Sequence, residues 1–204
     1  MTPPSIVLWC VDAQKDFMLP GGKLYVPGAE KLLPNIGRLV DIARAGKSFL
    51  VSHGCFHVPD DPEFSTFPPH CIRGTAGADF VSEAMTSDYV RIPNDPSAVL
   101  PEDFLRRQQI VLEKQTLDIF ESRHTDDLAG RLSPDADFVV FGVVTEYCVG
   151  FAAKGLIQRG RRVTIVSDAI ETLDRATGDR AVAELRSLGV DLTTTDRILN
   201  RLIF

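Results

Sequence analysis

The sequence has no excess of basic residues and no long hydrophobic run. Its 22 Lys and Arg residues are outnumbered by 28 Asp and Glu residues, which gives a formal net charge of -6 and a pI of about 5.2. Because nucleic-acid phosphates are bound by an excess of positive charge, we expect no nucleic-acid partner. No apolar run is long enough to cross a bilayer, and the N-terminus does not resemble a signal peptide. We therefore expect no membrane partner and a cytoplasmic location.

Cysteine is scarce, and its spacing excludes the common disulfide and metal-binding motifs. Cys10, Cys55, Cys71 and Cys148 lie far apart, with no CxxC pair among them. Free thiols in a reducing compartment are therefore expected. The chain also lacks internal repeats, low-complexity tracts and linkers, so residues 1–204 are interpreted as a single domain. A chain of this length can bury a substantial core without disulfides or metals.

Apolar runs alternate with amphipathic segments along most of the chain. The alternation predicts a parallel six-stranded sheet with helices on both faces, an α/β fold of the Rossmann-like type. The predicted strands are residues 5–11, 47–52, 110–113, 138–144, 162–166 and 190–193. Residues 28–45 carry a helical stripe in which the helix is expected to begin near Pro34, with this proline in its first turn. The other predicted helices are residues 122–132, 146–159 and 175–188, with a turn and short helix at 74–84. No firm element is assigned to residues 90–109, where prolines interrupt the pattern.

The run at 138–144 is the most apolar of the chain and indicates a strand buried on both faces. Thr145 and Glu146 are typical of a helix start, so Cys148 falls where a buried strand turns into a helix. Helix N-terminal amides favour an anion and lower the pKa of a thiol. A thiolate there could attack a carbonyl, with backbone amides ready to hold the oxyanion. The alternative is an inert buried cysteine.

Asp12 and Lys114 also follow predicted strands closely, at the same edge of a parallel sheet as Cys148. Asp12 could take the thiol proton and later deliver it to a leaving amine, while Lys114 stabilises both anions. Such a trio suits acyl transfer from an amide to water through a thioester. Alternatively, Asp12 caps a turn and Lys114 is a solvated loop residue.

A possible metal site lies in the loop region after the second predicted strand. Cys55, His57 and His70 offer thiolate and imidazole ligands, which zinc prefers, and a three-ligand site leaves a position open. His53 or Cys71 could replace one of the three. The nearby carboxylates are Asp60, Asp61 and Glu63. The alternative is that these histidines make ordinary loop hydrogen bonds.

The segments around these residues carry a family resemblance. VDAQKDF contains Asp12, EKQTLDIF begins with Glu113 and Lys114, GVVTEYCV contains Cys148, and FPPHCIRGTAGADF contains His70. Together they resemble the isochorismatase-like cysteine hydrolases, and within them the nicotinamidases. The resemblance implies a catalytic triad of Cys148, Asp12 and Lys114. It also implies a cis peptide at Val143–Val144 and an oxyanion hole formed by the amides of Val144 and Cys148.

In nicotinamidases an Asp-x-His pair and a later His bind a metal that takes the pyridine nitrogen. By resemblance, His57 and His70 are the two histidines, whereas Cys55 occupies the Asp position. A thiolate would shift the preference towards zinc and make the site sensitive to oxidation; equally, the metal could be lost and the substrate changed. Phe17 and Phe67 match the aromatic positions that flank the pyridine ring, or else they are core residues.

These observations lead to a main hypothesis and two alternatives. The main one is a metal-assisted amidase that converts nicotinamide to nicotinate and ammonia, with a divalent metal, expected to be zinc. The first alternative is a related amidase that acts on a carbamoyl or ureido compound without a metal. The second is a binding or scaffold protein of the same fold without catalysis. A homo-oligomer is expected on general grounds of symmetry and from the family.

Overall fold

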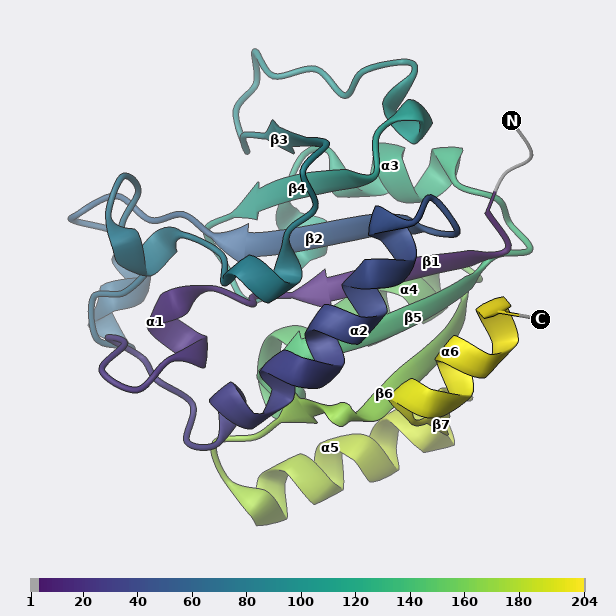
Figure 1. Cartoon of the computed structure of the whole chain (residues 1–204). Coiled ribbons are helices and arrows are strands. Elements are labelled where there is room, and N and C mark those ends of the chain that lie inside the picture. The colour runs from purple at the N-terminus through teal and green to yellow at the C-terminus, as the bar shows by residue number, and fades with distance from the viewer. Residues whose placement is uncertain (1–3, 204) are drawn as a thin grey trace.

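One parallel sheet forms the centre of the molecule (Figure 1). The computed structural model describes residues 4–203. The strand order is β3-β4-β2-β1-β5-β6-β7, and each pair of neighbouring strands is parallel. The strands are β1 (Ile6–Val11), β2 (Phe49–Cys55), β3 (Tyr89–Ile92), β4 (Gln109–Lys114), β5 (Asp137–Val143), β6 (Arg162–Glu171) and β7 (Asp191–Thr193). The α/β class and the parallel sheet expected from the sequence are confirmed.

The sheet has seven strands rather than the predicted six. The additional strand is β3 at one edge, in a region where the sequence predicted no firm element. Only Ile92 of its four residues is buried, and Tyr89 is exposed. An edge strand of this kind lacks the dense apolar run by which the buried strands were recognised, so its sequence resembles that of a loop.

Helices cover both faces of the sheet (Figure 1). The helices are α1 (Lys15–Met18), α2 (Leu33–Arg44), α3 (Thr125–Arg131), α4 (Gly150–Gln158), α5 (Arg175–Ser187) and α6 (Thr195–Ile203). Helices α2 and α6 contribute to one buried apolar cluster, and α3, α4 and α5 contribute to the other. No helix in residues 4–203 combines the length and the hydrophobicity needed to cross a membrane.

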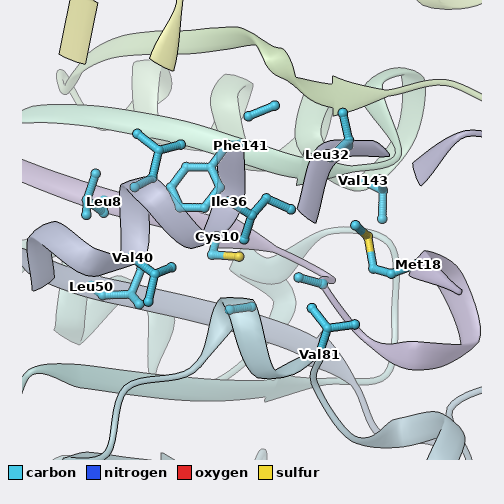
Figure 2. Close-up of a cluster of buried hydrophobic side chains, with 14 of the residues drawn as sticks. Leu8, Cys10, Met18, Leu32, Ile36, Val40, Leu50, Val81, Phe141 and Val143 are labelled. Atoms are coloured by element: carbon cyan, nitrogen blue, oxygen red, sulfur yellow. The ribbon is translucent and has the colours of Figure 1, made fainter. Parts of the chain in front are cut away.

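Helix α2 illustrates how the sequence pattern builds the first face. Ile36 and Val40 lie on its buried side, and Pro34 sits in its first turn, where a missing N–H costs nothing. Figure 2 shows their side chains among those of Leu8 of β1 and Phe141 of β5. Burial of these apolar surfaces fixes the helix against the two central strands.

Strands β2, β4 and β6 extend further than the sequence predicts, and the extensions of β2 and β4 carry polar residues into the site. Strand β2 continues to Cys55, so His53 and Cys55 lie on a strand and not in a loop, which corrects the prediction. Strand β4 ends at Lys114 itself. The ladder holds these residues in register, with His53 opposite Leu112 and Cys55 opposite Lys114. This part of β2 is not predicted from the sequence because it contains polar residues and Gly54 instead of an apolar run.

Candidate active site

The carboxyl ends of β1, β2, β4 and β5 meet at one edge of the sheet, and the arrowheads of β1, β2 and β4 point the same way in Figure 1. In parallel α/β sheets this edge is where binding sites form. Asp12 directly follows β1, while Cys55 and Lys114 end β2 and β4. Cys148 follows β5 after a short turn. The strand topology therefore gathers side chains from distant parts of the chain.

Lys114 is the centre of this cluster. Its Nζ lies 3.0 Å from Asp12 Oδ2, 2.9 Å from Cys55 Sγ and 3.5 Å from Cys148 Sγ, and it also donates to the carbonyl of Thr116 at 3.1 Å. Lys114 and Asp12 are almost completely buried. The alternative of a solvated lysine is therefore wrong. The structure brings together all three residues that the sequence proposed as a triad.

Charge stabilisation inside the cluster opposes the cost of burial. Burial would raise the pKa of Asp12, but the Lys114 ammonium and the neighbouring His53 outweigh it and hold that pKa well below its usual range. Burial would lower the pKa of Lys114, but Asp12 and the thiol groups raise it well above its usual value. The pair therefore exists as carboxylate and ammonium.

The Cys148 thiol does not have the lowered pKa that the sequence predicted. Complete burial and the Asp12 carboxylate raise its pKa well above the ordinary value, and Lys114 opposes this only in part. The expected effect of a helix N-terminus is thus outweighed by burial and a neighbouring anion. The resting group is a thiol beside a carboxylate, so its proton must move as the sulfur attacks.

The turn that carries Cys148 has an unusual backbone. The peptide bond between Val143 and Val144 is cis, as the resemblance implied. A single helical turn, Thr145–Val149, then leads into α4. Within it Tyr147 has φ -118° and ψ -106°, which is not helical. The turn brings Val144 and Cys148 to the wall of the same pocket.

Glu146 anchors this turn, whereas the sequence indicates only a helix start at this residue. Its carboxylate accepts hydrogen bonds from the backbone amides of Leu173 and Asp174, at 3.0 and 3.1 Å, and from the hydroxyl of Thr172 at 2.6 Å. These bonds tie the loop after β6 to the turn that carries Cys148. Leu173 thereby reaches the pocket wall. A Glu that accepts from a distant loop has no local sequence signature.

Cys55, His57 and His70 form a compact group of metal-ligand type. One ligand atom from each lies within 4.8 Å of the others, and all three residues are buried. His70 Nδ1 donates to the carbonyl of Pro68 at 2.8 Å, which leaves the lone pair on Nε2. His57 Nδ1 lies 2.9 Å from Asp61 Oδ2, although neither of its ring nitrogens makes a hydrogen bond of full geometry among residues 4–203.

This arrangement fits a divalent metal. In metal sites the second nitrogen of each ligating imidazole is held by a carbonyl or carboxylate. Pro68 holds His70 in this way, and His57 Nδ1 lies beside the Asp61 carboxylate. Glu63 is a further candidate ligand, because its Oε1 lies 4.0 Å from His57 Nε2 and 3.8 Å from His70 Nε2. A thiolate with two imidazoles suits zinc.

A pocket opens over the thiol of Cys148. Phe17 and Phe67 line it as expected, Phe17 packing on His70 with ring centroids 5.2 Å apart and Phe67 on Tyr147 at 6.1 Å. The other lining residues are Leu24, Val26, Cys55, Glu63, Leu117, Val144 and Leu173. Cys55, Glu63, His70 and Cys148 thus line an otherwise largely apolar pocket together with Val144. That layout suits a flat ring that carries both a metal-binding atom and an amide.

Residues 90–197, just over half of the chain, match the model of the isochorismatase domain, and the chain therefore belongs to that family. Among its curated relatives is the nicotinamidase/pyrazinamidase of Mycobacterium tuberculosis, 27% identical over 190 residues that cover 89% of this chain and 95% of the relative. The nicotinamidase of Escherichia coli is 25% identical over an alignment 221 residues long, which covers 95% of this chain and 96% of that relative.

The structural comparison agrees with the family assignment. The crystal structure of the pyrazinamidase of Pyrococcus horikoshii in complex with zinc superposes with a TM-score of 0.75 at 25% identity. The match covers 94% of this chain and 99% of that one. The similarity therefore extends over nearly the whole chain and includes the parts outside residues 90–197.

Proposed function

We propose that the protein is a cysteine-dependent amidohydrolase that converts nicotinamide to nicotinate and ammonia. The observation that carries the proposal is the buried contact of Lys114 Nζ with both Asp12 and Cys148 at the base of an aromatic pocket. The Cys55, His57 and His70 group on the same pocket adds a place for the ring nitrogen of such a substrate. The nicotinamidase relatives support the same reaction.

Acylation would proceed as follows. Cys148 Sγ forms a bond to the amide carbon while Asp12 takes the thiol proton, and the carbonyl electrons move onto oxygen. The amides of Val144 and Cys148 are proposed to hold that oxyanion. Asp12 then gives its proton to the amide nitrogen, the C–N bond breaks and ammonia leaves. Lys114 stays protonated throughout and keeps Asp12 ionised before and after each transfer.

Deacylation repeats these steps with water. Asp12 takes a proton from water as the water oxygen attacks the thioester carbon, and the amides of Val144 and Cys148 hold the second oxyanion. The C–S bond then breaks, Asp12 returns the proton to the leaving sulfur, and nicotinic acid is released, which gives up its proton to solvent and becomes nicotinate. Asp12 thus acts as base and acid in each half-reaction, which is why its position relative to the sulfur matters.

Cys55, His57 and His70 would hold a divalent metal, which we propose is zinc. Bound there, the metal supplies a Lewis acid for a donor atom of the substrate. Phe17 and Phe67 would flank the ring, and apolar walls such as Leu117 and Leu173 would exclude water from it. In this scheme the ring nitrogen orients the substrate while its amide meets Cys148.

An amide panel tests the proposal. Purified protein is assayed for ammonia release from nicotinamide, from benzamide, which lacks the ring nitrogen, and from carbamoyl and ureido compounds. We expect nicotinamide to have the highest kcat/KM and benzamide to be hydrolysed much more slowly. Faster hydrolysis of a ureido compound with nicotinamide inert would favour the carbamoyl amidase instead. No ammonia from any of them would point to a binding protein of this fold.

A metal measurement tests the ligand set separately. We expect elemental analysis of the purified protein to find zinc in stoichiometric amount, and we expect Cys55→Ser and His57→Ala to lose most of it, because each removes one ligand of the compact Cys55, His57 and His70 group. Cys71→Ala is the matched control and should keep the metal, since Cys71 is a buried thiol outside the group. Retention of zinc in both ligand variants would contradict the assignment.

Three further proposals concern the setting of the protein. Cys10, Cys55, Cys71 and Cys148 are all free and buried, which supports a reducing compartment such as the cytoplasm. A homo-oligomer is proposed from the general prevalence of symmetric assemblies and from the family. Residues 1–204 are proposed to fold as one domain. Light scattering coupled to size-exclusion chromatography measures the oligomeric state directly.

A further inference from the structure

His53 is a buried histidine that the proposed reaction does not use. It lies on β2, between the strand that leads to Asp12 and the strand that ends in Lys114, with Val11 and Leu112 as its register partners. Its side chain is completely buried, and it does not line the pocket. A substrate in that pocket would therefore not touch it. Any part that His53 has in catalysis must act through another residue.

The residue it contacts is Asp12. His53 Nδ1 lies 3.4 Å from Asp12 Oδ1, while Lys114 Nζ lies 3.0 Å from Oδ2. The backbone amide of Asp12 also donates to the carbonyl of His53 at 2.9 Å. One nitrogen thus faces each oxygen of the carboxylate. Catalytic contacts of this kind are often long in a free site and shorten when substrate binds.

The surroundings of the ring decide which nitrogen carries the proton. A carboxylate oxygen can only accept, so the proton belongs on Nδ1, which faces it. Neither ring nitrogen makes a hydrogen bond of full geometry among residues 4–203, but Nδ1 lies 3.4 Å from Asp12 Oδ1, whereas Nε2 faces no such acceptor; the ring packs edge-on against Trp9 with centroids 6.2 Å apart. A neutral ring with its single N–H aimed at Asp12 satisfies both conditions. The packing against Trp9 keeps the ring from turning away.

We propose that His53 is a positioning residue, which donates Nδ1–H to Asp12 Oδ1 and so fixes the carboxylate that exchanges protons with Cys148. Held only by Lys114, the carboxylate could rotate about its Cβ–Cγ bond and lose its aim at the sulfur. Such a misplacement lowers the rate of proton transfer and leaves the walls that bind the substrate intact. The role in turnover rests on the proposed amidase function, whereas the effect on the thiol does not require it.

Two substitutions of similar shape separate the hydrogen bond from simple packing. His53→Asn keeps an N–H donor at the position of Nδ1, and His53→Leu fills a similar volume without any donor. We expect His53→Leu to lower kcat for nicotinamide by about 10- to 100-fold, the range of a disturbed acid–base step, with KM changed by less than about threefold. His53→Asn should stay within about threefold of the unsubstituted protein.

Alkylation gives a second readout that needs no substrate. The rate at which iodoacetamide labels Cys148 is followed by mass spectrometry of its peptide, which separates it from the other cysteines. We expect slower labelling in His53→Leu and recovery in His53→Asn, because an aligned Asp12 assists loss of the thiol proton. Ser52→Ala is the control, since Ser52 is buried on the same strand and contacts Gln109, not Asp12.

The outcomes distinguish this proposal from the proposed function. If the unsubstituted protein releases no ammonia from any amide, the amidase proposal fails, and the labelling rates still decide the role of His53. Equal kcat and equal labelling rates in His53→Leu, His53→Asn and the unsubstituted protein would overturn the positioning role of His53. Equal losses in both variants, with melting temperatures like that of Ser52→Ala, would show a packing role and would also overturn it.

Discussion

Replacing Cys148 with alanine is expected to lower kcat for ammonia release from nicotinamide by at least about 1000-fold, the scale of loss when a nucleophile is removed. The sulfur is the only atom taken away from the reaction, while Asp12, Lys114 and the pocket walls remain in place. Water would then have to attack the amide directly, without a thioester. The measurement is the steady-state release of ammonia at saturating substrate.

Cys10→Ala provides the matched control. Cys10 is equally a buried free thiol, but it lies in the apolar cluster between α2 and the sheet, outside the pocket (Figure 2). Its loss should lower the melting temperature slightly through the small cavity that it leaves and should not change kcat. Similar kcat values for Cys148→Ala and Cys10→Ala would contradict nucleophilic catalysis by Cys148.

The second large effect is expected on stability, from Lys114→Met. Methionine preserves the length of the side chain but leaves the buried Asp12 carboxylate without its counter-ion. Removing one partner of a buried ion pair typically costs about 3–5 kcal/mol, because the remaining charge stays desolvated. Urea unfolding followed by circular dichroism measures this loss. Hydrolysis should fail as well, since the ammonium that stabilises both the Asp12 carboxylate and the attacking sulfur is gone.

An exposed ion pair gives the comparison. Lys15 lies 3.2 Å from Asp79, with side chains that are 41% and 64% exposed, so Lys15→Met should cost no more than about 1 kcal/mol. Adding Asp12→Asn to Lys114→Met should recover part of the stability, because the uncompensated charge is removed. A Lys114→Met variant no less stable than Lys15→Met, or losses that simply add in the double variant, would refute the buried ion pair.

The fold and the meeting of Asp12, Lys114 and Cys148 could be predicted because both depend on strongly patterned residues. The apolar run that became β5 can only be a strand buried on both faces, and it fixes the centre of a parallel sheet. Once the sheet is parallel, Asp12, Lys114 and Cys148 must share an edge, since each ends or follows a strand. The convergence of these three residues follows from the ends of their strands and does not depend on how the loops fold.

Prediction from the sequence failed where polar residues belong to strands or where residues distant in the chain affect one another. His53 and Cys55 read as loop residues, although β2 continues through them, and β3 lacks an apolar run. The raised pKa of Cys148 arises from burial beside Asp12, a neighbour more than a hundred positions away, and not from its own local helix. Such effects depend on tertiary packing, which no local pattern records.

The central claim is that the sulfur of Cys148 becomes covalently bonded to the acyl group of the substrate. Acid quenching of the enzyme during turnover of nicotinamide, followed by mass spectrometry of its peptides, tests this directly. The account predicts a nicotinoyl adduct on the Cys148 peptide that appears within the first turnover and disappears as the substrate is consumed. Steady release of ammonia with Cys148 unmodified at every quench time would contradict it.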